Sequence, residues 1–360
     1  MSGASVTTTL RYPLEAEPRT GDGSAVEVAP GVHWLRMPLF ASLPWINVWA
    51  IAGQPGWTVI DTGLNTEATT AAWDAAFAGA LGGAPVSRVI VTHMHPDHCG
   101  LAGWLARRFA ARLWMTRLEY LTCRLMAADP MRAPPADAID FYTAAGWDAA
   151  AIERYTERFG SFGQMIQPLP ASYRRIVDGE SLSIGGREWL VVVGNGHSPE
   201  HACLYCPERQ LLISGDQVLP RISSNVSVYP TEPDADPLGD WLGSLAAIKR
   251  RVPDEVLVLP AHNSPFNGLH ARIDALLAQH AASLERLEEL LAQPRRAVDV
   301  FPVLFSRPIG AGVLGMATGE AIAHLNRLER SGRARRDRDA HGVWWWRRTG
   351  GGAAEPAVFR

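Results

Sequence analysis

The sequence predicts an α/β protein, because short apolar strands alternate with helical segments along most of the chain. At 360 residues the chain is long for one domain, so a large domain with a smaller appendage is expected. Hydrophobic residues make up 47% of the chain, which is enough for a sizeable core. The net charge of -3 gives no overall attraction to nucleic acid or to a membrane surface.

Apolar runs and the turn residues between them place the expected elements. Strands are expected at 26–28, 32–35, 46–51, 57–60, 86–91, 112–115, 181–184, 188–193, 211–214 and 256–260. Helices are expected at 66–81 and 101–109, and then at 119–127, 138–145 and 149–159, with an interruption at 129–135. These last three helices break the alternation over residues 117–172, in a segment rich in Met, Phe, Tyr and Trp. We expect this insertion to form a lid over a site, or else to pack plainly against the sheet.

The four cysteines are too few and too scattered for a disulfide framework. Cys203 and Cys206 have the spacing of a zinc knuckle, but no second pair accompanies them. They lie in an expected strand, where positions three apart face opposite sides, so a thiolate site is disfavoured. Cys99 is interpreted as a small buried hydrophobic residue.

The first residues contain no basic region followed by an apolar one, so no signal peptide is expected. The chain contains no apolar run that approaches the length of a membrane span. We therefore expect a soluble cytoplasmic protein without a membrane partner.

The densest group of chemically active residues follows the strand expected at 86–91. His93, His95, Asp97 and His98 occur there within six residues. Alternation along a strand sends the first two side chains the same way, and the following turn brings the other two to a second position nearby. Imidazole and carboxylate groups are what Zn²⁺ and similar cations accept, so two incomplete metal sites are expected.

Three further candidate ligands each follow a strand. His197 lies in a loop bracketed by glycine after the strand at 188–193, Asp216 follows 211–214, and His262 follows 256–260. The carboxyl ends of strands are where α/β proteins collect functional groups. Asp61 ends the strand at 57–60, where it could turn inward to orient another group, cap the helix at 66–80, or do both.

This combination resembles the metallo-β-lactamase superfamily of hydrolases over roughly residues 25–268. The motif His93-x-His95-x-Asp97-His98, followed in order by His197, Asp216 and His262, carries the resemblance, and Asp61-Thr-Gly63 fits an early motif of the same family. It implies a four-layer αββα sandwich. It also implies that His93, His95 and His197 hold one metal, that Asp97, His98 and His262 hold a second, and that Asp216 bridges the two.

The expected reaction follows from two divalent ions, with Zn²⁺ favoured and Fe or Mn as alternatives. Two cations roughly 3.5–4 Å apart lower the pKa of a bridging water toward about 7, so hydroxide is the expected nucleophile. Asp97 is expected to pass a proton to the leaving group, and Asp61 to fix a ligand imidazole by a hydrogen bond. His201 is interpreted as a supporting or packing residue and not as a ligand.

Substrate contacts are expected in the polar segment 217–237, because a loop beside a metal centre should touch what binds there. Arg221, Asn225 and Tyr229 are the candidates. Arg221 could bind a carboxylate or phosphate, or it could pair with the acidic residues at 232, 234 and 236. Together with the aromatic insertion, the loop indicates a mid-sized substrate with an apolar and an anionic part.

Residues 269–350 form an expected second unit after a lead-in at 1–25 and a catalytic domain at 26–268. Helices at 269–291, 297–305 and 318–331 precede a hairpin of 333–338 and 343–348, which resembles the winged-helix appendage of some superfamily members. Eight arginines and three acidic residues lie between 327 and 348. This tail could bind nucleic acid, or it could shape the rim of the site or a homodimer interface. The second reading is favoured because the whole chain is acidic.

The sequence thus predicts a dinuclear metallo-hydrolase that cleaves an ester, thioester or lactone bond of a small molecule. The alternative is a metal-dependent endoribonuclease whose C-terminal domain binds RNA. A member that has lost hydrolysis and serves as a binding or redox module is disfavoured, because the ligand set is complete and no sequence remains for a flavodoxin-like domain.

Overall fold

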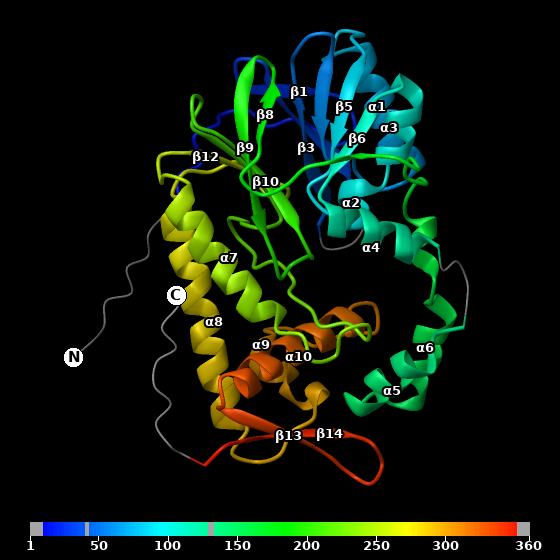
Figure 1. Ribbon diagram of the computed structural model, residues 1–360, viewed down its shortest axis with the longest axis vertical. Helices are drawn as coiled ribbons and strands as arrows, with labels where there is room; N and C mark the ends of the chain where they lie inside the picture. Colours follow the sequence, from blue (N-terminus) through cyan, green and yellow to red (C-terminus); the bar gives the residue numbers. More distant parts are fainter. Residues whose placement is uncertain (1–9, 40–42, 129–132, 351–360) are drawn as a thin grey trace, which may run out of the picture.

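The computed structural model describes residues 10–39, 43–128 and 133–350, and two β-sheets packed face to face dominate it (Figure 1). The first sheet has the order β1-β2-β3-β4-β5-β6-β7 and the second the order β12-β11-β10-β9-β8. The first comprises β1 (Ala25–Ala29), β2 (Val32–Pro38), β3 (Trp45–Ile51), β4 (Trp57–Ile60), β5 (Val86–Ile90), β6 (Arg112–Met115) and β7 (Arg174–Arg175). The second comprises β8 (Ser181–Ile184), β9 (Arg187–Gly194), β10 (His201–Cys206), β11 (Leu211–Gly215) and β12 (Leu257–Pro260).

Large apolar side chains from both sheets fill the space between them. Trp34 and Trp49 of the first sheet are fully buried there with Trp189 of the second. Strands β3, β4 and β11 are buried at almost every position, because both faces of each sheet are covered. This accounts for the continuous apolar runs that predicted these strands.

Helices cover the outer face of each sheet and complete four layers. On the first sheet lie α1 (Glu67–Ala78), α2 (Pro96–Cys99), α3 (Ala102–Phe109) and α4 (Arg117–Ala127). On the second lie α7 (Pro237–Arg251) and α8 (Leu269–Leu290), which share one core with the C-terminal part of the chain. The predicted αββα sandwich is therefore confirmed. In the part of the chain that the structure describes, no helix is both long and apolar enough to cross a membrane.

The structure corrects the sequence analysis in three elements. Helix α7 was not predicted, although Asp236 before Pro237 caps its first turn by accepting a hydrogen bond from the amide of Gly239. The helix expected at 297–305 is a 3₁₀ turn, η2 (Ala297–Val300), followed by a single α-turn, α9 (Phe301–Leu304), where Pro302 at the first turn lacks an amide proton. The two-residue strand β7 was also missed, because it is too short to show a pattern.

The described part of the N-terminal segment, which was expected as a lead-in, is held in place by hydrogen bonds. Arg11 pairs with Asn267 as an isolated β-bridge, and the carboxylate of Glu17 accepts a 2.7 Å hydrogen bond from Arg36. The same carboxylate accepts a second bond from Ser264. Residues 10–24 thus lie across the edge of the sandwich near the loop after β12.

The insertion packs against the C-terminal unit through α5 (Ala136–Ala144), α6 (Ala149–Arg158) and the turn after α5. Trp147 donates a 2.8 Å hydrogen bond from Nε1 to Oγ1 of Thr318, and the ring of Phe141 meets that of Trp344 edge-on at 5.6 Å. A 3₁₀ turn, η1 (Ser161–Gln164), then leads back to the first sheet. Part of the predicted interruption at 129–135 lies outside the described residues.

The C-terminal unit consists of α8, η2, α9, α10 (Leu314–Arg330) and a hairpin of β13 (Ala334–Arg338) and β14 (Trp344–Arg348). Alternation along β14 places its three tryptophans on two faces of the hairpin. Trp346 is fully buried and Trp344 packs beside it, whereas Trp345 is half-buried and donates its indole proton to Asp339. The hairpin is therefore fastened to the molecule by the face that carries Trp346.

This arrangement predicts unequal costs for two neighbouring substitutions. Trp346→Ala should lower the free energy of unfolding by about 3–5 kcal/mol, because a fully buried indole leaves a cavity. Trp345→Ala should lower it by less than about 1.5 kcal/mol, the scale of one partly solvated hydrogen bond. Urea unfolding monitored by circular dichroism measures both. Equal losses would contradict the assignment of faces on β14.

Candidate metal centre

The candidate ligands meet at one edge of the sandwich because each follows the carboxyl end of a strand. His93 and His95 come directly after β5, His197 after β9, Asp216 after β11 and His262 after β12. Among the described residues they form three groups whose ligand atoms all lie within 4.8 Å of one another. These groups are His93, His95 and His197; His93, His98 and Asp216; and Asp97, His98 and His262.

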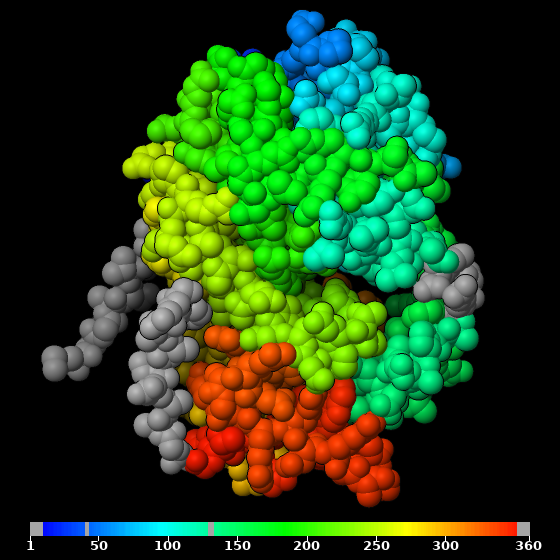
Figure 2. Space-filling model, in the orientation of Figure 1, coloured from blue at the N-terminus to red at the C-terminus, as the bar shows by residue number. Residues whose placement is uncertain are grey.

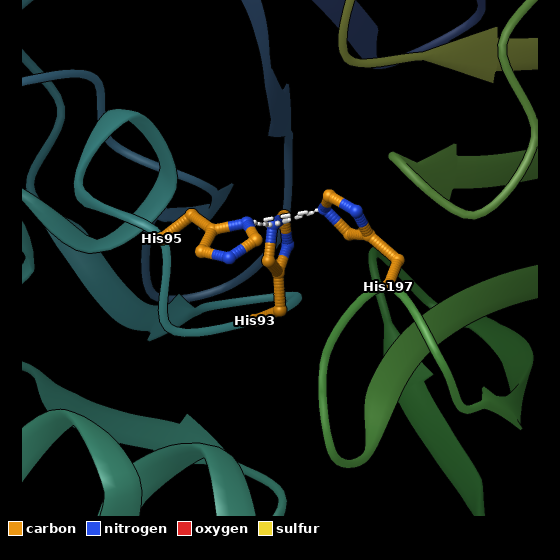
Figure 3. A group of neighbouring side chains, drawn as sticks. All are labelled: His93, His95 and His197. Carbon is orange, nitrogen blue, oxygen red and sulfur yellow. Dashed lines mark hydrogen bonds between the residues drawn. The ribbon is translucent and has the colours of Figure 1, made fainter. Parts of the chain in front are cut away.

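Three imidazole nitrogens of the first group converge on one point (Figure 3). Nε2 of His93 lies 2.9 Å from Nδ1 of His95 and 3.2 Å from Nε2 of His197. The remaining pair, Nδ1 of His95 and Nε2 of His197, is 3.1 Å apart. Three nitrogens arranged in this way can supply three of the four ligands of a tetrahedral cation.

Their hydrogen bonds show that at least two of these nitrogens present lone pairs. Nδ1 of His197 donates to the carbonyl of Asn225 at 2.7 Å, so its Nε2 carries no proton in the neutral ring. Thr92 gives its hydroxyl proton to Asp61, which leaves Oγ1 to accept from Nδ1 of His93 at 3.0 Å. Burial lowers the pKa of His95 to about 3, so this ring is neutral at pH 7. Neutral rings with converging lone pairs suit a metal cation.

The group of Asp97, His98 and His262, here called the second group, lies beside the first, and Asp216 approaches histidines of both. Nε2 of His262 is 3.4 Å from Oδ2 of Asp97 and 3.5 Å from Oδ1 of Asp216. Among the described residues, Nε2 of His98 and Oδ1 of Asp216 are buried atoms without a hydrogen-bond partner. Unpartnered buried polar atoms are costly, so these atoms also fit a cation.

Asp216 is oriented to serve both groups. Its Oδ2 lies 3.4 Å from Nε2 of His197, while its Oδ1 faces His98 at 3.5 Å. The amide of Asp216 donates to Nε2 of His201 at 3.1 Å, so that histidine supports the carboxylate. Gly215 has φ of +50°, and a Cβ there would approach Nε2 of His201 to 2.5 Å. Only glycine permits this close packing behind the site.

Asp61 accepts a hydrogen bond from Nδ1 of His98 at 2.8 Å, which directs Nε2 of that ring toward the second group. Its other oxygen accepts from the amide of Thr92 at 2.8 Å. A positive φ of 59° at Asp61 turns the carboxylate inward from the end of β4. The alternative that Asp61 caps the following helix is wrong. The N-cap of α1 is Thr66, whose hydroxyl accepts from the amide of Thr69.

Glu119 is a supporting residue that the sequence analysis missed. Its buried carboxylate accepts hydrogen bonds from the amide of Met94 at 2.8 Å, the hydroxyl of Ser198 at 2.6 Å and the amide of Glu200 at 2.7 Å. It thereby joins the loop of His95 to the loop of His197. Burial raises the pKa of Glu119 against the opposing effect of these bonds. The sequence did contain one indication of this role, because Glu119 is an acidic residue in a helix that was otherwise expected to bury an apolar face.

The candidate substrate residue Arg221 lies over the ring of Tyr12, with 5.3 Å between the guanidinium carbon and the ring centroid. Its alternative acidic partners are engaged elsewhere: Asp234 pairs with Arg336 at 2.6 Å and Asp236 with Arg327 at 2.9 Å. The idea that Arg221 pairs with them is therefore wrong for those two acids. Its role toward an anionic group stays a prediction.

Asn225 and Tyr229 lie in the segment that α10 holds. The side chain of Asn225 donates to Glu320 at 2.8 Å and accepts from Ser227 at 2.6 Å, while its carbonyl orients His197. Ser227 also donates to the carbonyl of Met316 at 3.2 Å. Asn225 thus links a candidate ligand to the C-terminal unit, and Tyr229, at 45% exposed, remains available for contact.

The cysteines take no part in any of the three groups formed by described residues. Cys203 packs in the core beneath α7 and α8, and Cys206 packs in the core between the sheets, so the two face opposite sides of β10 as expected. Cys99 is fully buried and its thiol donates to the carbonyl of Met94 at 3.0 Å.

A sandwich of this topology with two adjoining His/Asp groups defines a metallo-hydrolase suited to two metal ions. The chain belongs to the metallo-β-lactamase superfamily, whose model matches residues 46–262. A second model, the metallo-β-lactamase-like C-terminal domain, matches residues 284–349.

Similar proteins agree with this assignment along most of the chain. A crystal structure of a β-lactamase domain protein from Burkholderia ambifaria is 40% identical, with a TM-score of 0.87 over 94% of this chain and 98% of the other. The probable metallo-hydrolase YqjP of Bacillus subtilis is 24% identical over 82% of this chain and 91% of its own length. The acyl-coenzyme A thioesterase MBLAC2 of Bos taurus is 25% identical over 66% of this chain and 79% of its own length.

The shared carboxylate predicts that one substitution affects both metals. The wild-type protein should contain about two metal ions per chain, since each group offers a ligand set of the usual size. Asp216→Ala should lower occupancy at both positions and abolish activity, as measured by elemental analysis and turnover. The exposed Asp74→Ala is the matched control and should keep both metals. One tightly held metal in the wild type that survives Asp216→Ala would refute the dinuclear assignment.

Substitution of Asp61 tests how the orientation of an imidazole affects metal binding, because Asp61 is not itself a candidate ligand. Asp61→Ala should weaken metal binding roughly 10- to 100-fold at the group containing His98, because that ring loses the acceptor that fixes its tautomer. Competition with a chelator would resolve the two affinities. Thr66→Ala, which removes the cap of α1, should cost about 1 kcal/mol of stability and leave both affinities intact.

Proposed function

We propose that this protein is a hydrolase of thioester bonds in small molecules, with two divalent ions, Zn²⁺ first among them, held by the residues described above. The observation that carries the proposal is the pair of adjoining His/Asp groups that share Asp216. When bound, the two ions supply Lewis acidity and lower the pKa of a water molecule between them. In the part of the chain that the structure describes, no Ser or Cys side chain belongs to these groups, and the metal chemistry requires no such nucleophile.

The residues around the site hold and move protons. Asp97 is 25% exposed, in contrast to the fully buried His98 beside it, so its carboxylate can reach both the site and solvent. It is therefore placed to pass a proton to a departing thiolate. Asp61, Asn225 and Thr92 keep the imidazoles in the tautomers that leave their lone pairs free.

The choice of thioesters over other acyl bonds is supported by relatives. MBLAC2 is described as an acyl-coenzyme A thioesterase, and an atrochrysone carboxyl ACP thioesterase from Aspergillus fumigatus is 30% identical over 33% of this chain. Esters and lactones share the same electrophilic carbonyl and remain close alternatives.

The alternative of RNA cleavage has less support, because acidic side chains neutralise much of the C-terminal arginine cluster. Arg333 pairs with Glu288, Arg336 with Asp234, Arg338 with Asp140, and Arg347 with Asp337, at 2.5–2.7 Å. Arginines engaged in this way offer less charge to phosphates, whose contacts dominate nucleic-acid affinity.

A mixed substrate panel tests the proposal. Metal-loaded protein should hydrolyse acyl thioesters with a kcat/KM at least about tenfold above that for lactones and phosphodiesters. His95→Ala should abolish the turnover.

RNA affinity should be weak at physiological salt, and replacing Arg333 and Arg338 with Ala should change stability more than any RNA signal. Submicromolar RNA binding with a steep salt dependence, together with cleavage that requires His95, would overturn the proposal.

A further inference from the structure

Helix α4 carries an apolar stripe on the face that does not pack against the sheet. Its packed face is formed by Glu119, Tyr120 and Cys123, all buried. On the opposite face lie Leu118, Leu121 and Leu125, which are 45%, 52% and 63% exposed. Residues spaced by three, four and seven share one side of a helix. Three exposed leucines in a row are unusual on a polar surface and mark a binding surface.

Helix α4 begins beside the loop that carries His197. The amide of Leu118 donates to Oε2 of Glu200 at 2.8 Å, and Thr116 donates to the carbonyl of the same residue. Glu119, the next residue, joins the loops of His95 and His197. At about 1.5 Å per residue, the stripe extends roughly 10 Å from Leu118 to Leu125. A chain attached to a group at the metals could therefore lie along it.

The C-terminal unit contributes a second set of exposed apolar residues near the site. Met316 is 52% exposed and Val313 is 44% exposed, at the start of α10. Met316 precedes Glu320 by one helical turn, so the two share a face, and Glu320 contacts Asn225 beside His197. Figure 2 shows an opening below the cyan atoms of α4, bounded by the loop after β11 and by the insertion helices.

We propose that the α4 stripe and Met316 form an apolar channel that binds the acyl chain of the substrate. The preferred substrates are then thioesters of a medium-length, unbranched acyl group. This inference rests on the proposed thioesterase function and specifies its substrate class. Each buried methylene contributes about 0.8 kcal/mol, which corresponds to roughly fourfold in affinity.

An acyl chain fits this surface better than a protein partner does. A stable protein interface needs about 800 Å² from each side, far more than three leucines and one methionine provide. The stripe is as wide as a single helix face, and its first residue, Leu118, is bonded to Glu200 in the loop that carries His197. A narrow apolar track that starts beside this loop suits a linear chain bonded to the reacting carbonyl.

Binding of a series of straight-chain carboxylates, from butanoate to dodecanoate, to the metal-loaded protein tests the channel without requiring turnover. Calorimetry should show Kd falling about two- to fourfold per added methylene until the chain passes Leu125. The double variant Leu121→Gln/Leu125→Gln should flatten this dependence and lower the ratio of octanoyl to acetyl thioester kcat/KM by about tenfold or more. Glutamine keeps helix propensity, so α4 should remain folded.

Two controls separate the channel from general effects. Leu121→Met/Leu125→Met retains apolar surface and should keep the wild-type dependence on chain length. Val177→Gln replaces an exposed apolar residue between β7 and β8 and should also keep it. A wild-type protein that cleaves thioesters with no dependence on chain length would overturn the channel, as would glutamine variants that change only the oligomeric state in sedimentation. Chain-length-dependent carboxylate binding without thioester cleavage would support the channel and refute the proposed function.

Discussion

The structure depends on holding five imidazoles and two carboxylates with their ligand atoms facing one another in a buried space. Without a cation such an arrangement is repulsive and poorly solvated, so the surrounding protein must fix each ring. The fixing groups are specific: Asp61 holds His98, Thr92 holds His93, and the carbonyl of Asn225 holds His197. Each of these groups forms a hydrogen bond with the ring nitrogen that faces away from the centre, which leaves the other ring nitrogen free to bind a metal.

A second set of contacts holds the loops that carry these rings. Glu119 joins the loops of His95 and His197 through three hydrogen bonds to one buried carboxylate. His201 supports Asp216 from behind, where Gly215 leaves room for its ring. The geometry of the metal centre is therefore a property of the sheet edge as a whole, and it does not reside in the ligands alone.

The C-terminal unit takes part in the same architecture. Helix α10 binds the segment of Asn225 through Glu320 and the carbonyl of Met316, while the insertion packs on that unit through Trp147 and Asp140. Burial raises the pKa of Glu320 to about 7, so this contact is close to its titration range at neutral pH. One side of the opening is thus formed by a part of the chain that lies far from the ligand motif in sequence. The C-terminal unit can therefore influence which molecules reach the candidate metal centre.

The sequence alone determined the α/β class, most strand positions and the set of candidate ligands, because strand periodicity and the spacing of His93 to His98 are local properties. The pairing of each imidazole with its supporting group was decided by tertiary structure. Glu119, Thr92 and the carbonyl of Asn225 come together only when β5, α4 and the loop after β11 meet, and no local pattern in the sequence encodes that contact.

Helix α7 was missed because small and charged residues interrupt its apolar face, although Trp241 and Leu245 are fully buried once the second sheet is present. The exposed face of α4 was likewise undecided in the sequence, since its leucines could equally have faced the core. Which face of an amphipathic helix is buried depends on what it packs against, and only the folded chain supplies that partner.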